Sequence, residues 1–397
     1  YKEPSEEELS EYWNEAIELL RTSNTSVSNK VLLDNFRSQF ILGNKKAIWN
    51  AISEIFVAEG EIKQEWRSVL EMLLQDERVD AEDKKNISEL IGKYVSDKIR
   101  DDLKYKVALA PYSVSTVKGK RIDNSQEAAN QLAYVLFDND RFTWLEHMGL
   151  LLEGEQRKTL EFGRTCAVLK PGNDEFVELI MHNLAKIEPS VQNSSLVLGY
   201  LSGTNDSDFT RKTIDKFLAN EKIDFHAVRI SRLVELSLLE IEKLYPTFEK
   251  YPHLVAEFQS TNLTHLDENE LISFIRWLMA GDLMEWWWSA IDICEYHFKG
   301  IEKWSDEIIG LINSLLKKPG LVKGEGLHGW SSFFSHVELM RHLSSYQIDE
   351  EVVTTICRDI IALAEEFSIN NTFDLTEILG ILFRTNWDVS WPIISTE

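Results

Sequence analysis

Apolar residues recur along the chain at the spacing of one face of an α-helix. In the first segment they fall at i, i+3, i+4, i+7 and i+11, which places them on one side of a helix; they are Leu9, Tyr12, Trp13, Ala16 and Leu20. Ser5 precedes this run and Glu8 follows three residues later, the pattern of a capping box. The segment Glu6–Arg21 is therefore predicted to be a helix.

The same periodicity predicts many further helices joined by short links. They are Val31–Leu42, Lys45–Ala58, Lys63–Leu74, Ala81–Leu103, Ala128–Phe137, Phe142–Leu152, Gln156–Leu169, Asp174–Ile187, Ser194–Leu201, Phe209–Ala219, Phe225–Leu244, Asp267–Met279, Leu283–Phe298, Trp304–Leu316, Ser331–Leu343, Glu350–Phe367 and Leu375–Phe383. Asn124 with Glu127, and Asp267 with Glu270, are further cap-like pairs. Lys106–Val117 has a β-like composition, but Pro111 interrupts it, so it is predicted to be a loop. The expected fold class is all-α.

Breaks rich in Pro, Gly, Asn and Ser suggest how the chain is divided. The predicted parts are an N-terminal helical region (1–110), a linker loop (111–124), a central helical-repeat region (125–318), a Gly-rich loop (319–329) and an acidic C-terminal helical region (330–397).

One degenerate repeat is present. Leu198–Asn205 matches Leu379–Asn386 at Leu, Gly, Leu, Thr and Asn, with an offset of 181 residues. Each copy reads as the end of one helix followed by a short polar turn. Helical hairpins that cannot bury both faces alone stack on their neighbours, and the helix spacing here gives roughly 35–45 residues per hairpin.

On this spacing the chain resembles HEAT-type α-helical repeats, which implies stacked antiparallel helix pairs forming an α-solenoid. The segment from Leu382-Phe383 to Trp391-Pro392 also looks like the helical C-terminal regions of large bacterial NTPases, including antiviral defence sensors. The alternative architecture is a compact irregular helical domain.

The charge of the chain limits the kinds of partner that it can bind. The formal net charge is −24, which disfavours nucleic acids and anionic membranes as partners, because both need a positive surface. The acidic stretch Gln347–Leu379 is either a solvated helix face or a docking face for a basic partner.

No apolar run reaches the ~18 residues of a membrane span. The three cysteines are far apart, which fits free buried thiols and a cytoplasmic location.

Sequence motifs for catalysis, nucleotide binding or metal binding have little support in this chain. Gly324–Gly329 reads GxGxxG, but a predicted helix precedes it and no strand does, so a dinucleotide site is not expected. Glu338 and His342 share a helix face, with His336 about 120° away, so a metal site is not expected. No catalytic residue, cofactor or metal is predicted.

Tryptophans are the strongest candidates for binding. Trp286, Trp287 and Trp288 together cover about 200° of a helix surface. Trp287 continues a core stripe, whereas Trp288 lies among acidic residues and either meets the next helical layer or is an exposed interaction residue. His328 and Trp330, in the Gly-rich loop and directly after it, form a second candidate interaction surface.

We therefore expect a non-catalytic scaffold that binds another protein. The sharper version is a sensor or regulatory arm of a larger protein, suggested by the absence of Met at position 1. The alternative is a helical enzyme whose site is assembled across helices, for example from His336, Glu338 and His342. Nucleic-acid binding along a groove is less favoured, with Lys118, Lys120 and Arg121 as its candidate patch.

Overall fold

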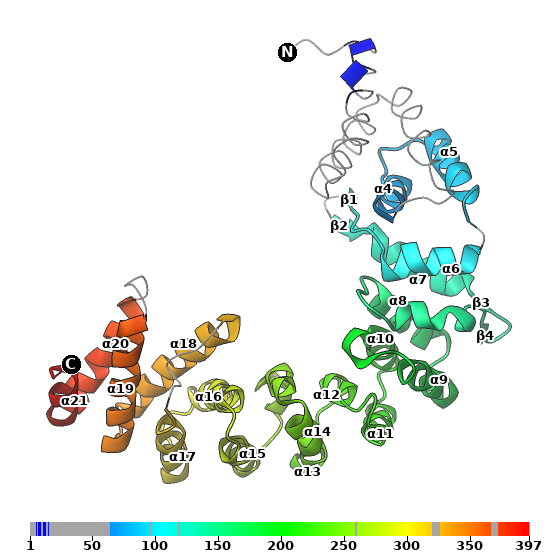
Figure 1. The fold of residues 1–397 in the computed structure, drawn as a ribbon. Helices are drawn as coiled ribbons and strands as arrows, with labels where there is room; N and C mark the ends of the chain where they lie inside the picture. Colours follow the sequence, from blue (N-terminus) through cyan, green and yellow to red (C-terminus); the bar gives the residue numbers. More distant parts are fainter. Residues whose placement is uncertain are drawn as a thin grey trace. The chain divides into compact units, whose positions relative to one another are not determined.

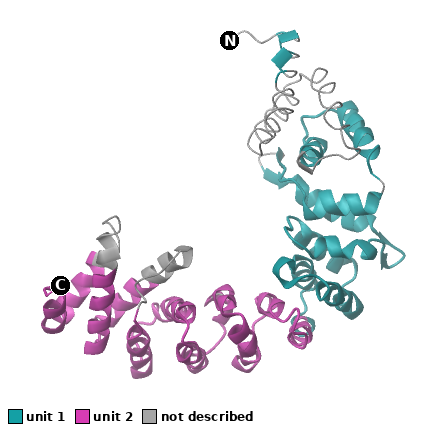
Figure 2. Cartoon of the chain, viewed as in Figure 1, with its two compact units in different colours: residues 1–209 teal, residues 210–397 magenta. Residues whose placement is uncertain are grey.

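The computed structural model confirms an all-α fold (Figure 1). It describes residues 5, 7, 8, 11, 12, 15, 64–95, 97–117, 120–258, 260–319, 326–366 and 372–396. The predicted helices Val31–Leu42 and Lys45–Ala58 lie outside the described residues. The chain divides into two compact units, 1–209 and 210–397, and the division falls inside helix α11, Ser207–Leu218 (Figure 2).

Unit 1 (1–209) consists of helices with two short hairpins. Its elements before α11 are α4 (Gln64–Gln75), α5 (Ala81–Gly92), α6 (Lys98–Leu103), the π-helix η1 (Lys104–Ala108), β1 (Val114–Val117), β2 (Lys120–Asp123), α7 (Asn124–Val135), β3 (Phe137–Asp138), β4 (Arg141–Phe142), the 3-10 helix η2 (Leu145–Leu151), α8 (Thr159–Leu169), α9 (Asp174–Leu184), the 3-10 helix η3 (Pro189–Val191) and α10 (Ser195–Thr204). Strands β1 and β2 are antiparallel, with Val114 opposite Asp123, and β3 pairs with β4 in the same sense.

Unit 2 (210–397) continues with helices. They are α12 (His226–Ser231), α13 (Leu238–Glu242), α14 (Tyr245–Lys250), the 3-10 helices η4 (Pro252–Glu257) and η5 (Ser260–Leu263), α15 (Glu268–Ala280), α16 (Met284–Phe298), α17 (Asp306–Leu316), α18 (Gly326–Leu343), α19 (Glu350–Glu366), α20 (Thr372–Thr385) and α21 (Trp387–Ile394).

The core of unit 1 is an aromatic cluster around the fully buried Trp144. Its ring lies 5.1 Å from Phe162 and 6.0 Å from Phe176, measured between centroids, and Phe176 lies 4.8 Å from Tyr200. The Tyr200 hydroxyl donates to the Lys170 carbonyl oxygen and accepts from the Asn173 backbone N–H at 2.8 Å. The polar end of this buried ring is thus satisfied.

Helices α8 and α10 cross very closely because glycines line the contact. A Cβ added at Gly203 would lie 2.7 Å from the Arg164 carbonyl oxygen, one at Gly163 would lie 2.5 Å from that of Leu196, and one at Gly199 would overlap that of Leu160. The backbones can therefore approach only where these side chains are absent.

The helices of unit 2 contact one another in a regular order. α15 packs on α17, α17 on α19 and α19 on α21, while α16 packs on α18 and α18 on α20. Several consecutive helices also touch, including α15 with α16 and α20 with α21. Each of these helices thus meets the helix two places along the chain.

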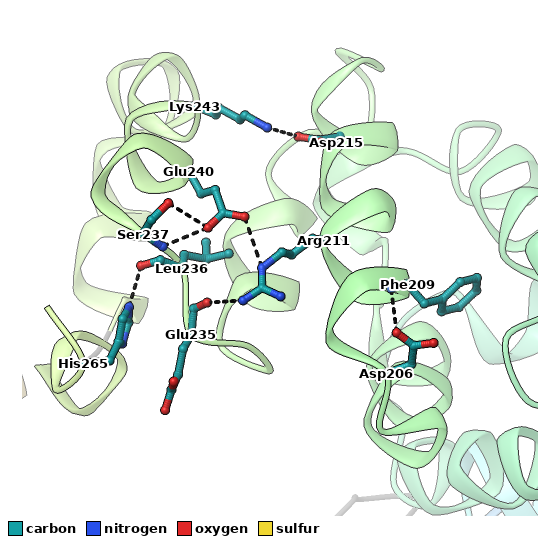
Figure 3. Close-up of polar contacts among 10 residues, drawn as sticks. All are labelled: Asp206, Phe209, Arg211, Asp215, Glu235, Leu236, Ser237, Glu240, Lys243 and His265. Atoms are coloured by element: carbon teal, nitrogen blue, oxygen red, sulfur yellow. Dashed lines mark hydrogen bonds and ion pairs between the residues drawn. The ribbon is translucent and has the colours of Figure 1, made fainter.

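Polar contacts join the start of unit 2 to its next helices, as Figure 3 shows. The Arg211 guanidinium of α11 donates to the Glu235 carbonyl oxygen at 2.7 Å and pairs with the Glu240 carboxylate at 3.1 Å. Lys243 pairs with Asp215 at 2.8 Å. Within unit 1, the Asp206 carboxylate accepts from the Phe209 backbone N–H at 3.0 Å as α11 begins.

Two predicted loops are partly regular structure. Residues 111–124 contain the β1–β2 hairpin, since Pro111 precedes the strand and so does not interrupt it, and the β-branched residues of Val114–Val117 suit a strand. The Gly-rich segment 319–329 is helical from Gly326, where α18 begins.

Three long predicted helices are broken. Ala81–Leu103 divides where Gly92 ends α5 and the Asp97 carboxylate caps α6. Phe225–Leu244 divides because Ser237 and Glu240 form a capping box that begins α13.

The third predicted helix, Phe142–Leu152, begins with the end of the β3–β4 hairpin and continues as 3-10 helix η2. Asn139 and Asp140 have φ of 47° and 61°, which suits a two-residue hairpin turn.

The cap predictions have mixed outcomes. The Ser5–Glu8 box is present, with reciprocal hydrogen bonds of 2.8 and 3.3 Å, and the Asp267–Glu270 box is present as well. Asn124 is not the cap of α7: the Asp123 carboxylate takes this role, accepting from the backbone N–H groups of Ser125 and Gln126.

The three cysteines are free and buried, as expected. Burial raises the pKa of each thiol, that of Cys357 to about 11. Within the described ranges, no helix is long and apolar enough to cross a membrane.

Candidate interaction surface

The tryptophan run on α16 is mainly a packing element. Trp286 is buried, its ring lies 4.7 Å from that of Trp277, and its Nε1 donates to the Pro252 carbonyl oxygen at 3.3 Å. Trp287 is half-buried and donates to the Gly281 carbonyl oxygen at 2.7 Å. The predicted stripe residues Ile291, Cys294 and Phe298 are buried, but in the tryptophan run the buried ring is that of Trp286 and not that of Trp287.

Trp288 is half-buried. Its indole Nε1 is enclosed and has no hydrogen-bond partner among the described residues. An enclosed donor and a partly covered ring offer a partner less area than a fully exposed tryptophan would. The role of Trp288 in binding stays a prediction.

The other two predicted interaction residues, His328 and Trp330, belong to the first turns of α18. Their side chains lie outside the described part of the chain, so their predicted role also stays a prediction.

A different pair of tryptophans is exposed to solvent. Trp387 and Trp391 of α21 are 50% and 46% exposed. Their rings stack at 4.9 Å between centroids with an interplanar angle of 8°. Phe383, from the end of α20, lies 5.3 Å from Trp387 and 6.1 Å from Trp391. We call Phe383, Trp387 and Trp391 the aromatic ladder.

Local structure fixes the orientation of the aromatic ladder. α20 ends at Thr385, whose hydroxyl donates to the Ile381 carbonyl oxygen, and Asn386 leads directly into α21. α21 packs on α19 and α20, with Ser390 buried on its inner side. Trp387 and Trp391 are one helical turn apart on the outer side.

A sequence signal for the ladder exists. Trp387 and Trp391 are four residues apart, which places them on one face of a helix, and Phe383 lies four residues earlier, before the turn. In the sequence, Phe383 and Trp391 belong to the segment that carries the NTPase resemblance, and neither is among the predicted interaction residues.

The groups suggested for an assembled enzyme site have separate surroundings. His336 is fully buried, and neither ring nitrogen has a hydrogen-bond partner in the described part of the chain. Glu338 forms an ion pair with Arg341, and the His342 ring lies 5.7 Å from Trp304. Among the described residues no group of three or more His, Cys, Asp or Glu side chains is placed to hold a metal ion.

A dense group of ionisable side chains lies instead in unit 1. Arg67 is buried and pairs with Glu71 at 3.0 Å and with Asp101, while its guanidinium lies 4.9 Å from the Tyr105 ring centroid. Burial raises the pKa of Glu71 and of Asp101, and the charge of Arg67 opposes both shifts. These contacts tie α4 and α6 to the π-helix η1, which is a structural role.

The predicted basic patch is only partly described. Lys120 and Arg121 are exposed on β2, whereas Lys118 lies outside the described residues. Neighbouring Asp123 pairs with Lys158 at 2.6 Å.

Comparisons with known proteins do not place the chain in a protein family. No family model matches the chain, and no curated protein matches it. Among solved structures, the chain is similar to the crystal structure of an engineered protein at 11% identity, over 96% of this chain and 98% of that chain, with a TM-score of 0.26. A likeness this weak carries no argument about fold or function.

Proposed function

We propose that this protein is a non-catalytic scaffold that binds another protein through the aromatic ladder. The observation that carries the proposal is the stacked pair Trp387 and Trp391, each about half exposed. Tryptophan is enriched among the residues that dominate binding energy at protein interfaces. Large apolar side chains gathered on a surface are typical of interaction sites.

The packing order of unit 2 supports a HEAT-like stack as the framework of this scaffold. In such a stack each helix packs on the helix two places along the chain, and a helix pair shares its core with the next pair. The contacts of α15 with α17, α16 with α18 and α18 with α20 follow that order. The ladder lies on the last of these helices, where α21 packs on α19.

The test compares binding by the intact chain with binding by Trp387→Ala/Trp391→Ala. Proteins retained from the source cells by the wild-type chain but lost on the variant are purified and titrated directly. Each lost hot-spot tryptophan weakens binding by about 2 kcal/mol, or roughly 30-fold.

The matched control is Tyr134→Ala, because Tyr134 is 54% exposed but lies on α7 in unit 1. It should retain the same partner at unchanged affinity. Equal binding of a purified partner by wild type and by the folded double variant would refute the ladder as the site.

A further inference from the structure

The aromatic ladder lies in an acidic part of the chain. From Asp349 to Glu397 there are ten Asp and Glu residues but only two Arg and no Lys. Helix α21 itself carries Asp388 and no basic residue. A partner therefore meets a negative potential as it approaches this end of unit 2.

Among the described residues, no cation contacts the face of either indole. No described Lys or Arg lies over the ring of Trp387 or Trp391, although such contacts exist elsewhere, for example Lys318 at 4.6 Å from the Trp287 centroid. Asp388, directly after Trp387, is exposed and forms no ion pair with a described residue. The site thus combines aromatic faces with an exposed carboxylate.

These two features complement an arginine side chain. A guanidinium is planar, stacks on aromatic faces and donates hydrogen bonds to a carboxylate. A second copy of this chain is a poor partner, because each copy carries a net charge of −24. Nucleic acid would be repelled for the same reason.

We infer that the aromatic ladder binds an arginine-bearing basic segment of a partner protein, with a guanidinium against the indoles and near Asp388. This inference rests on the proposed function and adds the chemical class of the partner.

The probe is a fluorescein-labelled peptide of alternating Arg and Leu, measured by anisotropy against the intact chain. The comparison peptide has citrulline at every Arg position, which keeps the planar group and removes the charge. We expect the Arg peptide to bind at least about 10-fold more tightly, because cation–π contacts and charge pairing are lost with citrulline. Trp387→Ala/Trp391→Ala should weaken the Arg peptide about 10-fold, the size expected for the loss of exposed cation–π contacts.

Two further variants separate a specific site from general attraction to an acidic protein. Trp387→Tyr/Trp391→Tyr keeps aromatic faces and should retain most of the affinity. Asp388→Asn should weaken binding by about 3-fold, the size of an exposed ion pair. Circular dichroism confirms that each variant is folded.

The outcomes distinguish the inference from the proposed function. Equal binding of both peptides, lost in the double Trp→Ala variant, overturns the basic partner and leaves the ladder as a docking site. Arg-peptide binding that is unchanged in that variant overturns the inference, since charge alone then explains it. No binding of the Arg peptide by the wild-type chain also overturns it, whereas the proposed function is still judged by its purified partner.

Discussion

The two copies of the Leu-Gly repeat, in α10 and α20, show how one local sequence serves two purposes. In both copies a threonine hydroxyl donates to the carbonyl oxygen four residues earlier, Thr204 to Tyr200 and Thr385 to Ile381, each at 2.9 Å. An asparagine follows in both. The local signal for ending the helix is therefore shared.

The surroundings of the two copies differ. Gly199 of α10 faces the backbone of α8 with no room for a Cβ, whereas the nearest described atom to a Cβ at Gly380 of α20 belongs to the Arg384 guanidinium, at 3.7 Å. The first copy uses its glycine for close helix packing, and no described backbone comes as close to the glycine of the second copy.

The residues at the end of each repeat copy and just after it also differ. Where the second copy has Phe383, Trp387 and Trp391, the first has Ser202, Asp206 and Thr210 at the same offset of 181 residues. The first copy thus has no counterpart of the aromatic ladder at these three positions.

The largest expected effect is that of Gly199→Ala. Forcing a methyl group against the Leu160 backbone separates α8 from α10 and lowers the free energy of unfolding by about 3 kcal/mol, the upper range for overpacking. Urea unfolding of the full chain measures this change. An unchanged midpoint would mean that the close crossing contributes nothing to stability.

The second largest effect is on the pH dependence of stability, and it arises from a buried polar side chain near the second copy. Tyr200 is satisfied by two hydrogen bonds, but His336, on α18 beside α20, has none in the described part of the chain. Burial lowers the pKa of His336 from 6.5 to about 4. The unfolded chain therefore takes up this proton more readily, and stability is lost as pH falls from 6.5 towards 4.

At pH 5 this loss amounts to about 2 kcal/mol relative to pH 7. His336→Leu should remove that share of the pH dependence, measured by urea unfolding at both pH values. His182→Leu, which removes an exposed histidine of α9, is the control for the loss of a histidine side chain. If His336→Leu has the same slope as wild type, then His336 is not buried in its neutral form.

The third effect has the opposite sign to the first. Gly380→Ala should stabilise the protein by about 0.5–1 kcal/mol, because alanine is the better helix former and the space is open. Gly310→Ala in α17, with no described atom within 4 Å of the added Cβ, should give a similar gain in urea unfolding. A loss at Gly380 with a gain at Gly310 would reveal a tight contact at the second copy after all.

The fold class could be predicted from the sequence, whereas the exposure of individual side chains could not, for physical reasons. Helical periodicity and capping boxes such as Asp267–Glu270 are local, and the structure contains them. The division of Phe225–Leu244 was missed although Ser237 and Glu240 carry the cap signal, because the apolar spacing ran on through it. Exposure depends on which helices pack on which face. A helical wheel thus placed Trp288 on a polar side, but the pattern of one helix does not specify its neighbours.

The smallest effect tests the asparagines that end the two copies. Asn205 has a left-handed φ of 53°, which glycine adopts without strain, so Asn205→Gly should stabilise by about 0.5 kcal/mol. Asn386 has an extended φ of −141°, where glycine only adds freedom to the unfolded chain, so Asn386→Gly should destabilise by about 0.5 kcal/mol. Opposite shifts in the urea midpoint are expected from the same substitution. Shifts of the same sign would show that the two copies end alike, and the contrast between them would then begin only at the aromatic ladder.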